Sequence, residues 1–475
     1  MSRGSANQIE IENREQGTGD WKLSYVARNH EIEGYASLTS VNAGEEISFF
    51  INTTDREYTL SIFRMGYYGG LGGRLMTSPI KLRGLAQRAS WSDPQTGMAE
   101  CEWREPYVLR IPVQWISGVY LVKLTGLSSL KERYIVFVVR NDGRKADLIM
   151  QSTVTTYQAY NPWGGKSLYK SNSTDKTAAV KVSFNRPYDD SDGAGLFLYW
   201  ELDMIGFLEK EGYDVVYSSN LDTHQGISAQ LHKGFLSVGH DEYWSWEMRQ
   251  HIETARDQGL SLGFFSANSC YWQIRLEPSP LTGDPNRTIV CYKIGHYIAA
   301  SEARRDPVAA QVSTHHLLTT RWRDPHGSLP GSPEDSLIGV MYNDTQPVDA
   351  DILIHDNSSW IFDNTGLKCG DMLRGLVGYE ADRMYGDAPA GTVRLTHSPY
   401  RLADGTNDYS DMTVYQAASG ATVFATGTLQ WSFGLGRISP WAPNPSRVNP
   451  AAQQITRNVL ARFTQFQPRS SSETN

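Results

Sequence analysis

The pattern of secondary structure changes at Asp142-Gly143, and this change constrains the fold more than any other feature of the sequence. Before it, turn residues such as Asn42-Ala-Gly44 separate short β-branched or aromatic runs with no amphipathic helix between them. These runs are 45–52, 58–64, 107–112, 118–124 and 134–140. They predict an Ig-like β-sandwich. The glycines of 69–73 do not fit a dinucleotide fingerprint and indicate a hairpin loop, so we expect no nucleotide cofactor.

Beyond residue 143, short apolar runs alternate with segments of helical spacing. The predicted strands are 147–151, 213–217, 235–238, 260–265, 337–342 and 421–427, and the predicted helices are 196–211, 245–259 and 451–463. Strands that alternate with helices predict a parallel sheet with right-handed crossovers. Ligands of such sheets bind beyond the carboxyl ends of the strands.

Length and composition indicate how the chain divides into domains and which kinds of partner it binds. We predict a poorly ordered polar lead-in, a sandwich, an α/β domain that carries the site, and a disordered tail, at 1–18, 19–142, 143–467 and 468–475. A net charge of -8 without a basic run argues against nucleic acid. No stretch approaches the ~18 apolar residues of a membrane span. With no apolar leader and four scattered cysteines, the sequence predicts a cytoplasmic protein that acts on a small molecule.

The first candidate site is the loop Gly239-His240-Asp241-Glu242-Tyr243-Trp244, directly after the predicted strand 235–238. Three ionisable groups and a phenol at the end of a buried strand cost stability unless they form hydrogen bonds or bind a ligand. In the alternative interpretation, Asp241 or Glu242 caps the following helix and the other side chains are solvated. The density of polar and aromatic groups favours function.

Two further loops follow predicted strands. Segment 155–169 is rich in aromatic and hydrogen-bonding groups, and its alternative is an ordered surface loop. Segment 266–272 contains Asn268 and Cys270. A cysteine on a sharp turn after a strand is a candidate nucleophile, and its alternative is a small buried thiol. Glu380 and Trp431 belong to unusual clusters late in the chain, which fit either a functional or a structural role.

Taken together, these segments resemble the family of the N,N-dimethylformamidase large (β) subunit. The resemblance is carried by Glu33-Gly-Tyr-Ala36, Arg64-Met-Gly-Tyr-Tyr-Gly69, Thr155-Thr-Tyr-Gln-Ala-Tyr-Asn161, Trp163-Gly-Gly165, Gly212-Tyr-Asp-Val215, Ser237-Val-Gly-His-Asp-Glu-Tyr-Trp-Ser245, Asn268, Tyr271-Trp-Gln-Ile-Arg275 and Gly375-Leu-Val-Gly-Tyr-Glu380. It implies a β-sandwich joined to an amidotransferase-like, flavodoxin-like α/β domain. It also implies iron, held by two tyrosines and a glutamate, that polarises an amide carbonyl and delivers hydroxide.

Of the family's three metal-ligand positions, one has a matching residue in this sequence. Tyr243 matches the second tyrosine, whereas Leu202 stands at the position of the first, and Tyr199 lies one turn earlier on the same predicted helix. No acid precedes Trp322 where the family has its carboxylate. Flanking candidates for a third ligand are Glu302 and Glu334, and His315 or His316 would shift the preference toward softer metals.

The resemblance implies a hydrolase that cleaves a C–N bond of a small amide by attack of water on a polarised carbonyl. The predicted acid and base groups are His240, Asp241, Glu242 and Glu380, with Asn268 holding the oxyanion. The predicted substrate contacts are Tyr157, Tyr160, Asn161, Trp163, Trp244, Tyr271 and Trp431. The alternatives are a non-catalytic protein that binds a small molecule or carbohydrate, and a metal-free enzyme with Cys270 as nucleophile. A homo-oligomer or a small partner subunit is compatible with the sequence.

Overall fold

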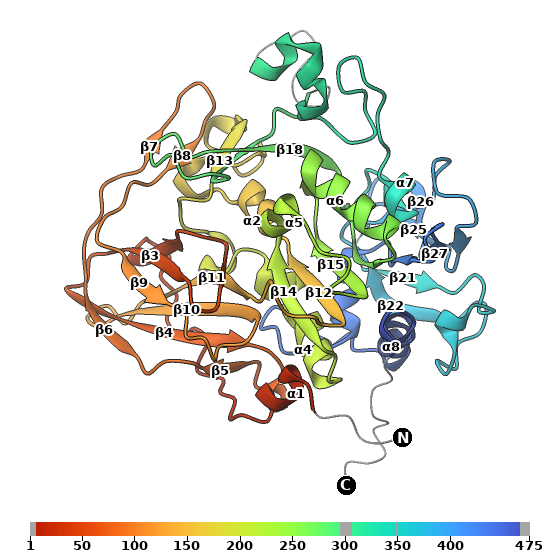
Figure 1. Cartoon of the computed structure of the whole chain (residues 1–475), viewed down its shortest axis with the longest axis horizontal. Helices are drawn as coiled ribbons and strands as arrows, with labels where there is room; N and C mark the ends of the chain where they lie inside the picture. Colours follow the sequence, from red (N-terminus) through yellow and green to blue (C-terminus); the bar gives the residue numbers. More distant parts are fainter. Residues whose placement is uncertain (1–5, 295–305, 348, 466–475) are drawn as a thin grey trace.

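A computed structural model describes residues 6–294, 306–347 and 349–465 as a mixed α/β protein with several antiparallel sheets and one mixed sheet (Figure 1). The tail predicted for 468–475 and the candidate ligand Glu302 lie outside the described residues. Among the helices that the structure describes, none is both long and apolar enough to cross a membrane.

Two sheets of the N-terminal segment pack around one core, and we call residues 32–140 the sandwich. One sheet has the order β1 (Ile32–Ala36), β3 (Glu46–Thr53), β9 (Tyr107–Arg110). The other has the order β2 (Ser40–Asn42), β11 (Glu132–Arg140), β10 (Gly118–Gly126), β4 (Glu57–Met65), β5 (Gly73–Leu75), with β6 (Ile80–Arg83) also on β4. Ile47 and Phe49 of β3 lie in one buried cluster with Leu60, Val122 and Phe137 of the facing sheet. The predicted runs thus form strands whose alternate residues face a shared core.

The central sheet has the order β14 (Val215–Ser219), β12 (Leu148–Ser152), β15 (Gly234–His240), β17 (Ser261–Ala267), β28 (Thr422–Ala425), β27 (Thr413–Gln416), β24 (Val393–Arg394). The first five strands run parallel, as the sequence predicted. The last two pair antiparallel, which the sequence did not predict. A parallel sheet with an antiparallel edge is common in α/β proteins.

Both faces of the central sheet are covered. On one face, α6 (Trp246–Asp257) packs its residue Ile252 into a cluster with Ile149 and Phe235. On the other face, Met150 and Leu236 lie in a larger cluster with α4 (Leu202–Lys210), α8 (Pro450–Thr464) and part of the sandwich. Figure 1 shows the sandwich strands, red to orange, beside β14 and β12 of the central sheet, whose strand β27 is blue. Burial on both faces explains the continuous apolar runs of these strands.

Smaller elements surround these two parts. They are α5 (Asn220–Gln225), a sheet of β13 (Lys181–Ser183), β19 (Thr288–Val290), β18 (Trp272–Glu277) and β16 (Tyr243–Ser245), and the pairs β7 (Trp91–Ser92) with β8 (Ala99–Glu100), β21 (Ala350–Leu353) with β22 (Met372–Val377), and β25 (Ser398–Arg401) with β26 (Asn407–Ser410). Ser245 caps α6, as predicted, because its hydroxyl oxygen accepts the backbone N–H of Met248 at 3.2 Å.

Several predicted elements were wrong in detail. The helix predicted over 196–211 is divided into α3 (Phe197–Trp200) and α4 at Glu201, whose carboxylate accepts hydrogen bonds from Ser152 and the backbone of Thr153. The segment predicted as a loop from 155 begins with helix α2 (Val154–Tyr160).

Two other segments also differ from the prediction. The strand predicted over 337–342 is helix α7 (Asp335–Ile338) followed by β20 (Met341–Tyr342), which pairs with β23 (Asp382–Arg383). Gly339 separates α7 from β20 at a φ of 91°, which terminates the helix. The lead-in contains helix α1 (Gln8–Glu12), because Ile9 is buried in the large core cluster.

A buried ion pair links the sandwich to the α/β part. Arg64 of β4 donates to Glu209 of α4 at 2.7 and 3.0 Å, and both side chains are fully buried. Tyr217 donates to the same carboxylate at 2.9 Å, and the backbone oxygen of Ser117 accepts from Arg64 at 3.0 Å. Burial of two charges is tolerated here because each has several partners.

We expect Glu209→Ala to lower the free energy of unfolding by about 3–5 kcal/mol, because Arg64 is then buried without its counter-charge. Urea unfolding followed by circular dichroism measures this loss. Arg374→Ala is the control, since this side chain is 80% exposed in its pair with Asp351 and should change stability by less than about 0.5 kcal/mol. Equal effects of the two substitutions would contradict the assignment.

Candidate functional site

The candidate site lies where neighbouring parallel strands end. β15 ends at His240, Asn268 directly follows β17, and α2 directly follows β12. Glu380 comes from a segment far along the chain, where an isolated bridge pairs Ala381 with Thr428 just after β28. The topology therefore brings four separate stretches of sequence to the carboxyl edge of one sheet.

At the centre of the site, the His240 imidazole lies between two carboxylates. Its Nε2 is 2.9 Å from Oε2 of Glu380 and 3.2 Å from Oε2 of Glu242. All three side chains are at least 96% buried. Neither contact has the angles of a hydrogen bond, so we describe both as ion pairs. Two buried carboxylates around one imidazole favour the imidazolium form.

The pKa values of this group follow from burial and charge. Burial alone lowers the pKa of His240, but the negative charges of Glu380 and Glu242 outweigh burial and raise the pKa to about 10. Burial raises the pKa of Glu242, whereas contact with His240 lowers it, and the net shift is downward. At neutral pH the site therefore contains an imidazolium and an ionised Glu242.

Phenol groups surround the Glu242 carboxylate. Tyr160 and Tyr169 donate to it at 2.9 and 2.6 Å, and Tyr243 donates to the phenol oxygen of Tyr169 at 2.6 Å. Burial and the charge of Glu242 raise the pKa of each phenol well above its usual value. These tyrosines therefore act as neutral hydrogen-bond donors.

The Lys293 ammonium lies 3.5 Å from the centre of the Tyr169 ring, and burial lowers its pKa to about 8.

Besides Nε2 of His240, which lies in the ion pairs, two buried polar atoms near Glu380 have no hydrogen-bond partner within the described chain. Asn268 donates through Nδ2 to Oε2 of Glu380 at 3.0 Å, which leaves its Oδ1 unpartnered. His240 is likewise unpartnered at Nδ1. Buried polar atoms of native proteins are nearly always satisfied by protein, water or ligand. These two atoms therefore leave hydrogen-bonding capacity that water or another molecule can satisfy.

Two neighbours position this loop. Asp241 accepts hydrogen bonds from the neutral side chains of Gln151, Asn220 and Ser237 at 2.7, 3.0 and 2.8 Å, and burial raises its pKa. Its contacts anchor the loop rather than extend the His240 cluster. Gly239 has a φ of 70°, and a Cβ atom there would lie 2.3 Å from Cβ of Trp200, so only glycine fits.

Most of the residues predicted to contact substrate lie outside the cluster of His240, Glu242 and Glu380. Their polar groups bind partners outside the His240 cluster: Tyr157 binds Glu201, Asn161 binds Gln158, Trp163 binds Glu33, Tyr271 binds Asp344, and Trp431 binds Thr456. Trp244 is fully buried in the cluster of α6. Of the predicted substrate contacts, Tyr160 donates a side-chain hydrogen bond to the charged cluster, and Tyr271 reaches it through its backbone N–H, which donates to the backbone oxygen of Glu242 at 2.9 Å.

The three predicted metal ligands point to different partners. Tyr243 bonds with Tyr169, the ring of Tyr199 packs on Trp200 at 4.4 Å, and Glu334 pairs with Arg323 at 3.0 Å. The position of Leu202 is fully buried and has no ligating atom. Each of these three residues thus contacts a partner of its own rather than another of the three.

The histidine alternative gives no assembled site either. His315 contacts Ser328, and His316 packs against Trp246. Among the described residues, no group of three or more histidine, cysteine, aspartate or glutamate side chains is arranged to hold a metal ion.

Cys270 lies close to the site but in an unfavourable environment for a nucleophile. Its backbone N–H donates to the carbonyl oxygen of Asp241 at 2.9 Å, and its side chain is fully buried. Burial raises the pKa of the thiol well above its usual value. A thiolate is therefore disfavoured at this position.

The sequence analysis missed Tyr169 and Lys293. Tyr169 belongs to the aromatic segment 155–169, but its contact with Glu242 depends on how the chain returns after α2. Lys293 follows β19 and has no motif around it. Its place in the site becomes evident only from the structure, where its ammonium group lies over the rings of Tyr169 and Trp272.

The protein combines a buried acid–imidazole cluster at the carboxyl edge of a mixed sheet with a β-sandwich. The chain matches the family model described as N,N-dimethylformamidase beta subunit-like, C-terminal, over residues 59–446. It therefore belongs to this family, as the sequence resemblance predicted. A search of curated proteins finds no match.

We expect His240 to remain an imidazolium at pH 8, because its two carboxylate partners raise its pKa to about 10. NMR of protein with labelled histidine measures this state, and the signal is assigned by its loss in His240→Gln. The unfolded pKa is about 6.5. The contribution of charged His240 to the stability of the folded state is thus fully present below about pH 6.5 and is lost as the pH rises through about 10. Titration of the assigned signal near pH 6.5 would contradict this account.

Proposed function

We propose that the protein hydrolyses a C–N bond of a small amide of the formamide type. The proposal follows from family membership and rests on one observation. The unpartnered Nδ1 of His240 and Oδ1 of Asn268 belong to side chains that both contact Oε2 of Glu380. A proton donor, a hydrogen-bond acceptor and a carboxylate therefore occur together, and amide hydrolysis requires these groups.

The reaction moves one proton from water to the departing amine. Asn268 accepts a hydrogen bond from the attacking water through Oδ1, and Glu380 takes the proton of that water as its oxygen bonds to the carbonyl carbon. His240 donates its Nδ1 proton to the amide nitrogen as the C–N bond breaks. Glu380 then releases its proton to water, and Nδ1 of His240 regains a proton from water, which restores both groups; Nε2 keeps its proton beside Glu380 throughout, at 2.9 Å.

Glu242 has a supporting role in this scheme. It keeps His240 protonated before the substrate binds, because the carboxylate lies 3.2 Å from Nε2. The phenols of Tyr160 and Tyr169 hold the carboxylate in place at 2.9 and 2.6 Å. Fixed partners of this kind avoid reorganisation during the reaction.

Iron remains part of the proposal, because the family resemblance implies it. Tyr243 would be one ligand, and the others would differ from Tyr199 and Glu334. Elemental analysis with visible spectroscopy tests this point. Stoichiometric iron with a phenolate absorption band that Tyr243→Phe abolishes would support Tyr243 as a ligand. Metal-free protein with full activity would instead support the acid–base reaction alone.

We expect purified protein to release amine from small N-alkylated formamides, and Glu380→Gln to lower kcat by about 10²–10⁴-fold, as for loss of a general base. Amine release is measured by chromatography. Glu253→Gln is the matched control, because Glu253 pairs with Arg249 on α6 and is outside the charged cluster.

Two outcomes would contradict the proposal. Full activity of Glu380→Gln would remove this residue from the reaction. No hydrolysis of any small amide by the folded, metal-supplemented protein, with a small molecule still bound tightly, would favour a binding protein.

A further inference from the structure

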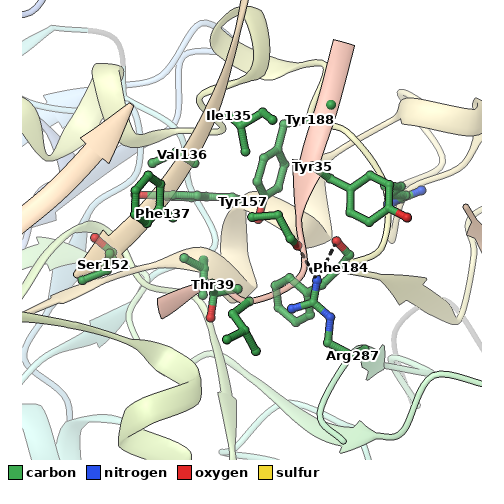
Figure 2. A pocket seen from close by; sticks show the side chains of 16 residues that line it. Tyr35, Thr39, Ile135, Val136, Phe137, Ser152, Tyr157, Phe184, Tyr188 and Arg287 are labelled. Carbon is green, nitrogen blue, oxygen red and sulfur yellow. Dashed lines mark hydrogen bonds between the residues drawn. The ribbon is translucent and has the colours of Figure 1, made fainter. Parts of the chain in front are cut away.

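A cavity lies between the sandwich and the α/β part, away from the charged cluster. Strands β1 and β11 of the sandwich line one side, and the end of β12, helix α2 and residues 184–188 line the other (Figure 2). Its volume is about 20 Å³, counted as the space open to the centre of a water-sized sphere. This space suits a ligand of one or a few heavy atoms.

Arg287 presents an unsatisfied donor at this cavity. Its Nη2 donates to the backbone oxygens of Ala36 and Phe184 at 2.9 and 3.1 Å, and its Nε donates to Asn185 at 2.8 Å. Its Nη1 has no hydrogen-bond partner among the described residues. The side chain lines the cavity, and the residue is only 3% exposed. A buried guanidinium N–H without an acceptor is costly, so the cavity should supply one.

A second buried guanidinium group lines the same cavity. Arg186 is 1% exposed, and its hydrogen bonds go to neutral oxygens, including Oε1 of Gln158 and the backbone oxygen of Trp163. Burial lowers the pKa of both Arg186 and Arg287 to about 10, which shows how weakly their charges are compensated.

The nearby acids lie outside the cavity lining. Glu100 reaches Arg287 only through Asn185, which donates to Glu100 at 2.8 Å. Asp284 also affects Arg287, and Asp189 and Asp190 affect Arg186, but none of these acids lines the cavity. Of the described residues around this cavity, two are cationic and none is acidic.

We infer that this cavity is a binding site for a small monovalent anion of halide size, held by Nη1 of Arg287. The anion satisfies the unpartnered N–H and offsets the charges of two guanidinium groups that line one space. Rings of Tyr35, Tyr157 and Phe184 form much of the remaining wall (Figure 2). A charge-assisted hydrogen bond in such an enclosure is stronger than one in water.

Bromide diffraction tests the site directly. Crystals of the full chain are soaked in sodium bromide, and data are collected at the bromine absorption edge. We expect an anomalous peak within hydrogen-bond distance of Nη1 of Arg287. Density for water alone at that point, without anomalous signal, would overturn the inference. This readout does not depend on amidase activity, so it is independent of the proposed function.

Chloride-35 NMR line broadening tests the site in solution. We expect Arg287→Gln to weaken chloride binding about tenfold or more, as for loss of a hydrogen bond to a charged group. Arg374→Gln is the control, because this arginine is exposed and pairs with Asp351. Unchanged broadening in folded Arg287→Gln would contradict the site.

Discussion

The paired charges of His240, Glu242 and Glu380 set the requirements that the rest of the site must meet. An isolated charge at this depth would cost far more than a folded domain can tolerate. Each group is instead held by neighbours: Glu242 by two phenols and Glu380 by Asn268. The cluster is therefore stable only as a unit, and loss of one member leaves the others buried and unpaired.

The fold places this unit through ordinary sheet topology. Because β12, β15 and β17 are neighbours and run parallel, the residues that follow them meet at one edge. Both faces of the sheet are buried, and the Arg64–Glu209 pair joins the sandwich to the helix that follows Glu201. A rigid scaffold is what an acid–base site needs, since small displacements weaken proton transfer.

The sequence predicted the local parts of this arrangement well. The apolar run before His240 and the polar residues after it identified a strand end, and the same signal identified Asn268. It also singled out Glu380, but not its contact with His240, because that contact joins residues that are distant in the chain.

Contacts that depend on the path of the chain were missed for the same reason. Tyr169 and Lys293 join the site only through tertiary structure. Helical spacing placed Tyr199 one turn from the Leu202 position, but its ring packs on Trp200. The helix predicted over 196–211 is interrupted at Glu201, whose carboxylate accepts a hydrogen bond from the backbone N–H of Thr153. Periodicity describes which face of an element is apolar, but not which distant side chain meets it.

A crystal structure with a small amide bound tests the central claim most directly. Our account predicts the amide group within hydrogen-bond distance of Nδ1 of His240, whereas an amide bound away from the His240–Glu380 pair would contradict it.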